Sequence, residues 1–142
     1  MVRLLTPGII SLLLTVLCTG CNPPKVEGEA AVSQQNLRSI GNAYVQSINK
    51  KNKVPANRQD LLPYLAGEPD KIFRSENDGE EFVILWGVDH RTYAAAGKQM
   101  PVTAYEKTGK GGKRLVLRVS VIFHLTEEEF QKAPFPQGHK AP

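Results

Sequence analysis

The most regular pattern of apolar positions lies in the first third of the chain. The apolar side chains recur at steps of three, four and four residues: Leu37, Ile40, Tyr44 and Ile48. This spacing places them on one face of an α-helix. Lysines cluster at the far end of the stretch, where the helix dipole favours cations, and Pro55 prevents further helix. We predict an amphipathic helix from about Ala31 that packs its apolar face against the rest of the domain, rather than into a partner's groove.

A second, short helix is predicted to follow. Asn57 is a good N-cap, and Asp60 lies in the first turn, where the helix dipole favours an acid. The leucines that come next would point inward, and a proline and a glycine keep the helix short. The polar stretch from Glu68 to Glu80 is interpreted as a loop.

The second half of the chain is strand-like. The run from Phe82 to Trp86 is continuously apolar and aromatic, which is typical of a buried strand. Another strand is predicted for Val102 to Glu106, whereas Tyr93 to Ala96 fits either type of element. The glycine-rich segment from Thr108 to Gly112 predicts a tight turn, since glycine supplies the positive φ that hairpins need.

Alternation of apolar and polar residues is cleanest between Arg114 and His124. One face would carry Leu115, Leu117, Val119, Val121 and Phe123, and the other Arg114, Arg118, Ser120 and His124. The segment is either one long strand or two strands separated by a bend near Arg118-Val119-Ser120.

The best-specified element is a short helix near the C-terminus. Thr126 and Glu129 form a capping box, and Leu125 with Phe130 fits the hydrophobic staple around it. Prolines close this helix, and residues 137–142 are predicted to be a disordered tail. The pattern therefore predicts one α+β domain over residues 31–136, with an N-terminal amphipathic helix packed on a small antiparallel sheet and a short C-terminal helix.

The first residues have the pattern of an export signal. Arg3 precedes a breaker and an apolar run from Ile9 to Leu17, which is shorter than the roughly 20 residues that span a bilayer. The segment that ends at Cys21 resembles a bacterial lipobox, although Cys18 stands where that family prefers leucine. The resemblance implies removal of residues 1–20, lipid on Cys21, and a tether over residues 21–30. The domain would then lie on the non-cytoplasmic side of the plasma or outer membrane. An ordinary signal peptide or an uncleaved anchor is the alternative.

Composition excludes several classes of function. The net charge is +4, but the basic residues are scattered among acids and form no stripe, so nucleic acid is not an expected partner. The chain has two cysteines, Cys18 and Cys21; one would leave with the signal and the other would carry lipid, so no thiol remains for a disulfide or a metal. The three histidines, His90, His124 and His139, lack paired ligand spacing, and we predict no metal and no cofactor.

Catalytic motifs are scarce. The glycine-rich turn is not a P-loop, because Lys107 replaces its first glycine and Arg114 replaces its Ser/Thr. Asp89 and His90 are the only adjacent acid–base pair; such a pair can serve a general base, but is more often a polar turn. Trp86 is expected in the core, although with Tyr93 it could stack on a sugar or a peptide. We expect a protein that is not an enzyme.

Several segments together resemble type II secretion pseudopilins and related pilin-like proteins. These are Asn36–Tyr44, Asp60–Leu65, Trp86–Asp89, Tyr105–Lys107 with Gly111-Gly112, and Phe123–Phe130. The resemblance covers roughly residues 32–135 and implies a helix across a small antiparallel sheet, with a role in envelope assembly. Two departures stand out: a lipobox replaces the long apolar helix of pseudopilins, and Arg118-Val119-Ser120 replaces their Asp-Gly turn. The leading hypothesis is a structural or adaptor lipoprotein with secretion or pilus-assembly proteins as partners; the alternative is a ligand-binding or hydrolytic protein that uses Asp89 and His90.

Overall fold

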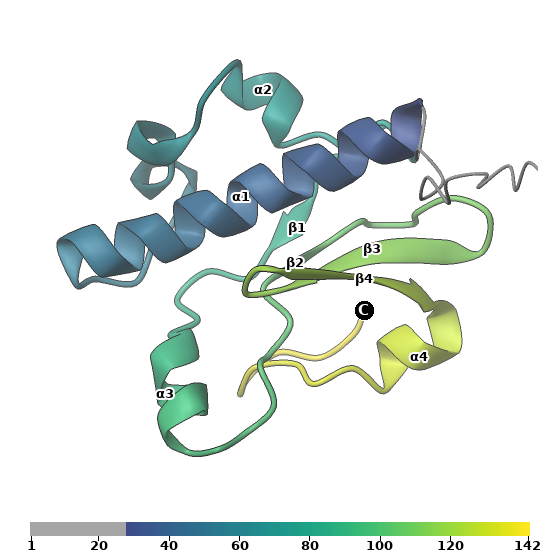
Figure 1. The fold of residues 1–142 in the computed structure, drawn as a ribbon. Helices are drawn as coiled ribbons and strands as arrows, with labels where there is room; N and C mark the ends of the chain where they lie inside the picture. Colours follow the sequence, from purple (N-terminus) through teal and green to yellow (C-terminus); the bar gives the residue numbers. More distant parts are fainter. Residues whose placement is uncertain (1–27) are drawn as a thin grey trace, which may run out of the picture.

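A long helix crosses a four-stranded antiparallel sheet in the computed structural model, which describes residues 28–142 (Figure 1). Helix α1 (Glu29–Lys51) buries the predicted face: Leu37, Ile40 and Ile48 are fully buried, and Tyr44 is 3% exposed. The predicted α+β arrangement is confirmed. In the described part of the chain no helix has both the length and the apolar character needed to cross a bilayer.

The segment after α1 makes three short helical turns. Asn57 is the predicted N-cap, and its side chain accepts hydrogen bonds from the backbone of Gln59 and Asp60. The single predicted helix is two successive 3-10 turns, η1 (Arg58–Asp60) and η2 (Leu62–Tyr64). The predicted loop after Glu68 is wrong at its start, where helix α2 (Pro69–Ile72) forms. Proline at the first position has the φ of a helix already, and the turn buries Ile72 in the core.

The strands are shorter than the sequence pattern suggests, and their order along the sheet is sequential. Strand β1 (Val83–Ile84) pairs with β2 (Ala104–Tyr105), and β2 pairs with β3 (Lys113–Arg118). Between β1 and β2 lies helix α3 (His90–Ala95), so the ambiguous segment around Tyr93 is helical. The glycine-rich turn lies between β2 and β3, as predicted.

A two-residue turn divides the segment that could have been one strand or two. Strand β3 pairs with β4 (Val121–Thr126) in one unbroken register. Partners directly across an antiparallel pair share a face of the sheet, so Leu117 shares its face with Ile122, and Val116 shares its face with Phe123. The prediction that Leu117 and Phe123 lie on one face is therefore wrong, because the turn places one strand beside the other.

Both faces of the sheet are covered, and β3 is consequently buried on both sides. Helix α1 lies on the face of Ala104 and Leu117, while helix α4 (Glu127–Gln131) and the chain after it cover the face of Tyr105 and Val116 (Figure 1). The predicted capping box of α4 is present. Its fully buried Phe130 contacts the ring of Tyr105, with 4.9 Å between ring centroids.

Close approach of α1 to the β3–β4 turn depends on a glycine. A Cβ atom at Gly41 would lie 2.8 Å from the carbonyl oxygen of Val119, which is closer than packed atoms tolerate. Val119 itself has a φ of 62°, a left-handed conformation that is rare for a β-branched residue. The turn is therefore held in a strained conformation directly beneath the helix.

The final residues have a defined course. For 137–142 we predicted disorder, but the structure describes these residues and places a turn there, in which the backbone N–H of His139 donates to the carbonyl of Pro136. Ala141 packs against the core. The two prolines before the tail keep the chain extended against the sheet, where the carbonyl of Pro134 accepts a hydrogen bond from Val102.

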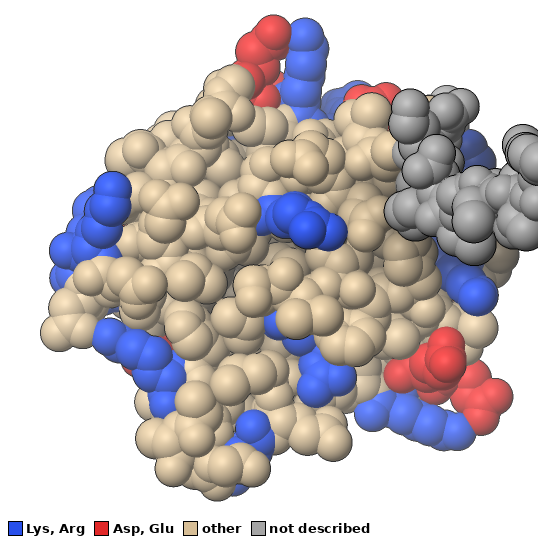
Figure 2. Space-filling model, viewed as in Figure 1, with Lys and Arg blue, Asp and Glu red and all other residues tan. Residues whose placement is uncertain are grey.

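Charged side chains are scattered over the surface. On the face shown in Figure 2, lysines and arginines are separated by uncharged residues. Several described cations pair with nearby acids, among them Lys71 with Glu68 and Lys132 with Glu128. The face shown thus presents no continuous basic stripe to a polyanion.

Candidate functional site

The Asp89 carboxylate is bound by a neighbouring cation rather than by His90. It caps α3 by accepting a hydrogen bond from the backbone of Arg91, and it also accepts two hydrogen bonds, of 2.9 and 2.8 Å, from the Arg91 guanidinium. The side-chain bond from Arg91 is the main cause that holds the pKa of Asp89 below its usual value. A carboxylate with this partner is a weak base, so Asp89 is poorly suited to abstract protons.

His90 is the first residue of α3 and is half-buried. Burial lowers the pKa of its ring, and the charge of Asp89 only partly opposes that effect. No hydrogen bond between the two side chains is present in residues 28–142. The adjacent acid–base pair in the sequence therefore does not form an acid–base dyad in space.

Asp89 does line a hollow on the surface beside α3. This hollow, of about 240 Å³, is also lined by Trp86, Tyr93 and His139. A second, larger hollow of about 540 Å³ adjoins it and includes Tyr93, Lys98 and Phe135. The two share Thr92, Tyr93 and Gln137, and we call the combined depression the α3 groove. His90 is not among the residues that line it.

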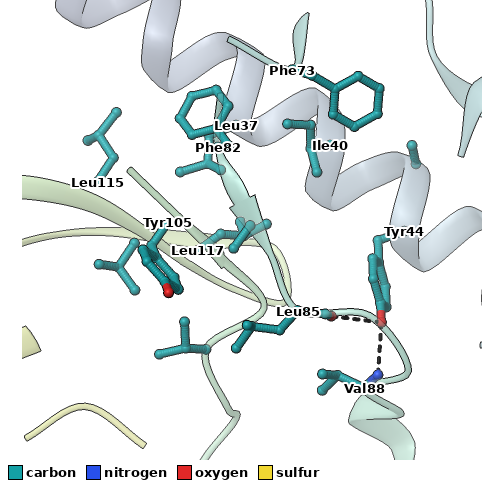
Figure 3. Packing of buried hydrophobic residues seen from close by; sticks show 14 of the residues in the cluster. Leu37, Ile40, Tyr44, Phe73, Phe82, Leu85, Val88, Tyr105, Leu115 and Leu117 are labelled. Atoms are coloured by element: carbon teal, nitrogen blue, oxygen red, sulfur yellow. Dashed lines mark hydrogen bonds between the residues drawn. The ribbon is translucent and has the colours of Figure 1, made fainter. Parts of the chain in front are cut away.

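Tyr44 of α1 holds the segment before α3 that lines the α3 groove. The Tyr44 hydroxyl accepts a hydrogen bond of 2.9 Å from the backbone N–H of Val88 and donates one of 3.3 Å to the carbonyl of Leu85 (Figure 3). Its ring stacks on Trp86, with 6.5 Å between centroids. Burial raises the pKa of Tyr44 to about 12. Trp86, expected in the core, is only partly buried, and part of its surface lines the groove.

The lining of the α3 groove mixes apolar faces with polar groups. Aromatic side chains offer apolar faces, and Asp89, His139, Gln137 and Lys98 offer polar groups around them, the mixture that orients a small ligand. The groove has no nucleophile paired with a base among its lining residues. Residues 28–142 contain no group of three or more histidine, cysteine or acidic side chains placed to hold a metal.

Two other residues named from the sequence stand apart from the groove. Cys21 lies outside the described residues. His124 is exposed on β4, where it pairs with Leu115 of β3. The structure therefore brings together Trp86, Asp89, Tyr93 and His139, while His90 and His124 lie elsewhere.

A buried polar network that the sequence pattern does not predict lies beneath the β2–β3 hairpin. Glu106, only 1% exposed, accepts hydrogen bonds from the side chains of Ser75 (2.6 Å) and Asn77 (2.7 Å) and from the backbone of Leu115 (2.7 Å). Ser33 of α1 joins the network, with 3.2 Å between its hydroxyl oxygen and that of Ser75. A buried carboxylate is tolerated only with such partners. The available signal was Ser33, four residues before Leu37 on the apolar face of α1.

A second acid fastens the same hairpin. The Asp78 carboxylate accepts hydrogen bonds from the backbone of Thr108 (3.0 Å) and Gly109 (2.9 Å). Burial raises the pKa of Asp78, but these backbone bonds outweigh it and the net pKa is lowered. The loop after α2 is thus bound to the hairpin twice, by Asp78 near the surface and by the bonds of Ser75 and Asn77 to the buried Glu106.

Comparison with known proteins adds no relative to this picture. No family model, no curated protein and no solved structure matches the chain.

Proposed function

We propose that the protein is a lipid-anchored component of the bacterial cell envelope with a structural or adaptor role. The observation that carries the proposal is the position of Cys21 within its lipobox-like segment, only a few residues before α1 begins at Glu29. A short connection of this kind would hold the domain close to the bilayer surface. Stable anchoring needs more than one acyl chain, which a bacterial lipoprotein normally carries.

The arrangement of the domain supports an adaptor role. The first turn of α1 lies at the end of the domain that carries the β2–β3 hairpin, since Ala30, Lys110 and Lys113 line one small hollow. Helix α3 lies at the opposite side of the molecule (Figure 1). With the anchor at the first end, the α3 groove would face away from the membrane, where partners can reach it.

The resemblance to pilin-like proteins suggests the kind of partner. A helix across a small antiparallel sheet is the architecture that the resemblance implies, and this chain has it. We therefore propose secretion or pilus-assembly proteins of the envelope as candidates.

Fatty-acid labelling tests the anchor. Labelled palmitate should enter the native chain and a Cys18→Ala variant, whereas Cys21→Ala should lose the label completely. Undiminished labelling of Cys21→Ala, at equal protein level, would refute the anchor.

Crosslinking in intact envelopes tests the adaptor role. The tagged full chain should be captured together with components of secretion or pilus assembly, identified by mass spectrometry. Efficient capture of the chain without any of these components contradicts the adaptor proposal and leaves the anchor untouched.

A second candidate function is binding of a small ligand in the α3 groove. It is favoured by one observation: Trp86, Asp89 and Tyr93 surround a single hollow. Because Asp89 is held by Arg91 and His90 lies outside the groove, the geometry favours binding over hydrolysis. Ligand-observed NMR with a set of sugars and short peptides should give signals that Tyr93→Ala abolishes and that Tyr64→Ala, outside the groove, preserves. Signals that persist in Tyr93→Ala would exclude the groove.

A further inference from the structure

Strand β4 is an unprotected edge of the sheet. It is last in the strand order, so it pairs with β3 on one side only. Its six residues, Val-Ile-Phe-His-Leu-Thr, include no proline, lysine, arginine or acid, and all six pair with β3 without a bulge. Val121 is 54% exposed. Edge strands normally carry charges, prolines or bulges that prevent pairing with another chain, and β4 has none of these.

The hydrogen bonds of β3 show which backbone groups of β4 face the open edge. The carbonyls of Leu115 and Leu117 accept bonds from the β2 side, from Glu106 (2.9 Å) and Thr103 (2.8 Å). Since successive residues of a strand direct their backbone groups to opposite sides, Val116 and Arg118 face β4. Their partners in β4 are Phe123 and Val121. The other, alternate residues of β4 therefore direct their backbone N–H and C=O groups toward the open edge.

These outward residues are Ile122, His124 and Thr126. The N–H of Thr126 agrees with this assignment, because it does not bond to β3 and instead donates to the Glu129 carboxylate at 2.8 Å. For Ile122 and His124, the described residues provide no hydrogen-bond partner beyond the strand itself. Two residues of β4 thus present a free donor and acceptor each.

We propose that β4 pairs antiparallel with β4 of a second copy of this chain, around a two-fold axis at Phe123. In this register Ile122 lies opposite His124 of the second copy, and the outward groups of each satisfy those of the other. Val121 lies opposite Leu125, on the same face of the sheet. The exposed Val121 is thereby covered by an apolar side chain, and cross-strand apolar pairs of this kind stabilise sheets.

Charge selects a second copy in antiparallel orientation. Three exposed acids follow β4 directly, Glu127, Glu128 and Glu129, of which Glu127 pairs with Arg114 and Glu128 with Lys132 of the same chain. Arg118 lies next to the start of β4. Antiparallel pairing brings the acidic end of each copy beside Arg118 of the other. Parallel pairing would instead place the two acidic ends together, and like charges side by side oppose association.

Disulfide crosslinking of the full chain in intact envelopes tests this register. Phe123→Cys would face its own counterpart across a non-hydrogen-bonded pair, where Cα atoms lie about 4.5 Å apart, within the range that a disulfide spans. Val121→Cys is the matched control, since it is more exposed than position 123 but lies about four residues, or roughly 13 Å, from its counterpart. The native chain controls for bonds through Cys18 or Cys21.

A second crosslink removes dependence on the Phe123 side chain, which is half-buried and carries Arg118 over its ring. Two differently tagged chains, one Val121→Cys and the other Leu125→Cys, should crosslink when expressed together and not when expressed alone.

The expected result is a reducible dimer for Phe123→Cys and for the mixed pair, and none above native background for Val121→Cys alone. Equal crosslinking of all variants would show random proximity and overturn the proposal. Absence of any dimer, or an adduct with a different protein, would equally overturn pairing with a second copy. His124→Pro, which removes an outward N–H that the fold does not use, should abolish the dimer while circular dichroism stays native.

Discussion

Replacing Val119 by glycine should stabilise the protein. Val119 is the first residue of the two-residue β3–β4 turn and has a φ of 62°. A left-handed conformation costs an ordinary L-residue roughly 1–2 kcal/mol, and glycine removes this strain. The unfolded chain gains entropy at glycine, which takes back about 0.5–1 kcal/mol. Little packing is lost, because Val119 is outside the hydrophobic core. We expect a net gain of about 0.5–1 kcal/mol in the free energy of unfolding.

Urea unfolding followed by fluorescence measures this gain, since Trp86 is the single tryptophan and lies far from the turn in sequence. Val119→Asn should give a comparable gain, because asparagine tolerates the left-handed region without the entropy of glycine. Val119→Thr keeps the β-branch and should leave stability within about 0.5 kcal/mol of native, the usual range for a surface substitution. A Val119→Gly protein no more stable than native, with an unchanged m-value, would refute the reasoning that the turn is strained.

Three further substitutions test the contacts that position the sheet. Gly41→Ala should lower the free energy of unfolding by about 1–3 kcal/mol, the usual penalty for overpacking, because its Cβ would meet the Val119 carbonyl; an unchanged urea midpoint would contradict the close approach. Tyr44→Phe should destabilise by about 1–3 kcal/mol, since the Val88 N–H loses its acceptor. The pKa of Tyr44 is raised in the folded state to about 12. The contribution of this shift to the free energy of unfolding is therefore complete below the unfolded pKa of about 10 and is lost as pH rises toward 12. Tyr44→Phe should reduce this loss of stability at alkaline pH, measured by thermal unfolding. Asp78 has a lowered pKa in the folded state, so its contribution to the free energy of unfolding is present above its unfolded pKa and is lost as pH falls through the folded pKa. Asp78→Asn should therefore weaken the decrease of stability at acid pH. A decrease at acid pH equal to that of the native chain would contradict this role of Asp78.

The helical elements could be predicted because local signals specify them. Leu37, Ile40, Tyr44 and Ile48 follow a helical period, Asn57 caps the turn after it, and Thr126 with Glu129 caps α4. Such signals act over a few residues and survive in any tertiary context. Helix α2 was missed because its four residues bury only one side chain, too few for a period to appear.

The faces of the sheet could not be predicted in the same way. Alternation continues through Val119 as if no turn were present, and only the pairing of β3 with β4 shows that Leu117 and Phe123 lie on opposite faces. The buried network had a similarly weak signal. Glu106 lies 31 residues after Ser75 and 29 after Asn77, and Ser33 lies 42 residues before Ser75. Only the folded chain brings these polar residues into contact. Asp89 and His90 are neighbours in sequence but do not act together in the fold, since Asp89 bonds to Arg91 and lines the α3 groove, whereas His90 does not line it.

The buried network also explains how a domain held at its N-terminus would resist unravelling from that end. On the proposed anchoring, any pull through the tether enters the domain at Glu29, the first residue of α1. The apolar core begins only at Leu37, but Ser33 already accepts hydrogen bonds from the backbone of Glu76 (2.8 Å) and Asn77 (3.0 Å). Ser33 is fully buried and both bonds are partly shielded from water, so breaking them leaves the Ser33 hydroxyl without its partners. The first turns of α1 are therefore fixed to the loop after α2 by polar contacts, at the end where the apolar contacts have not yet begun.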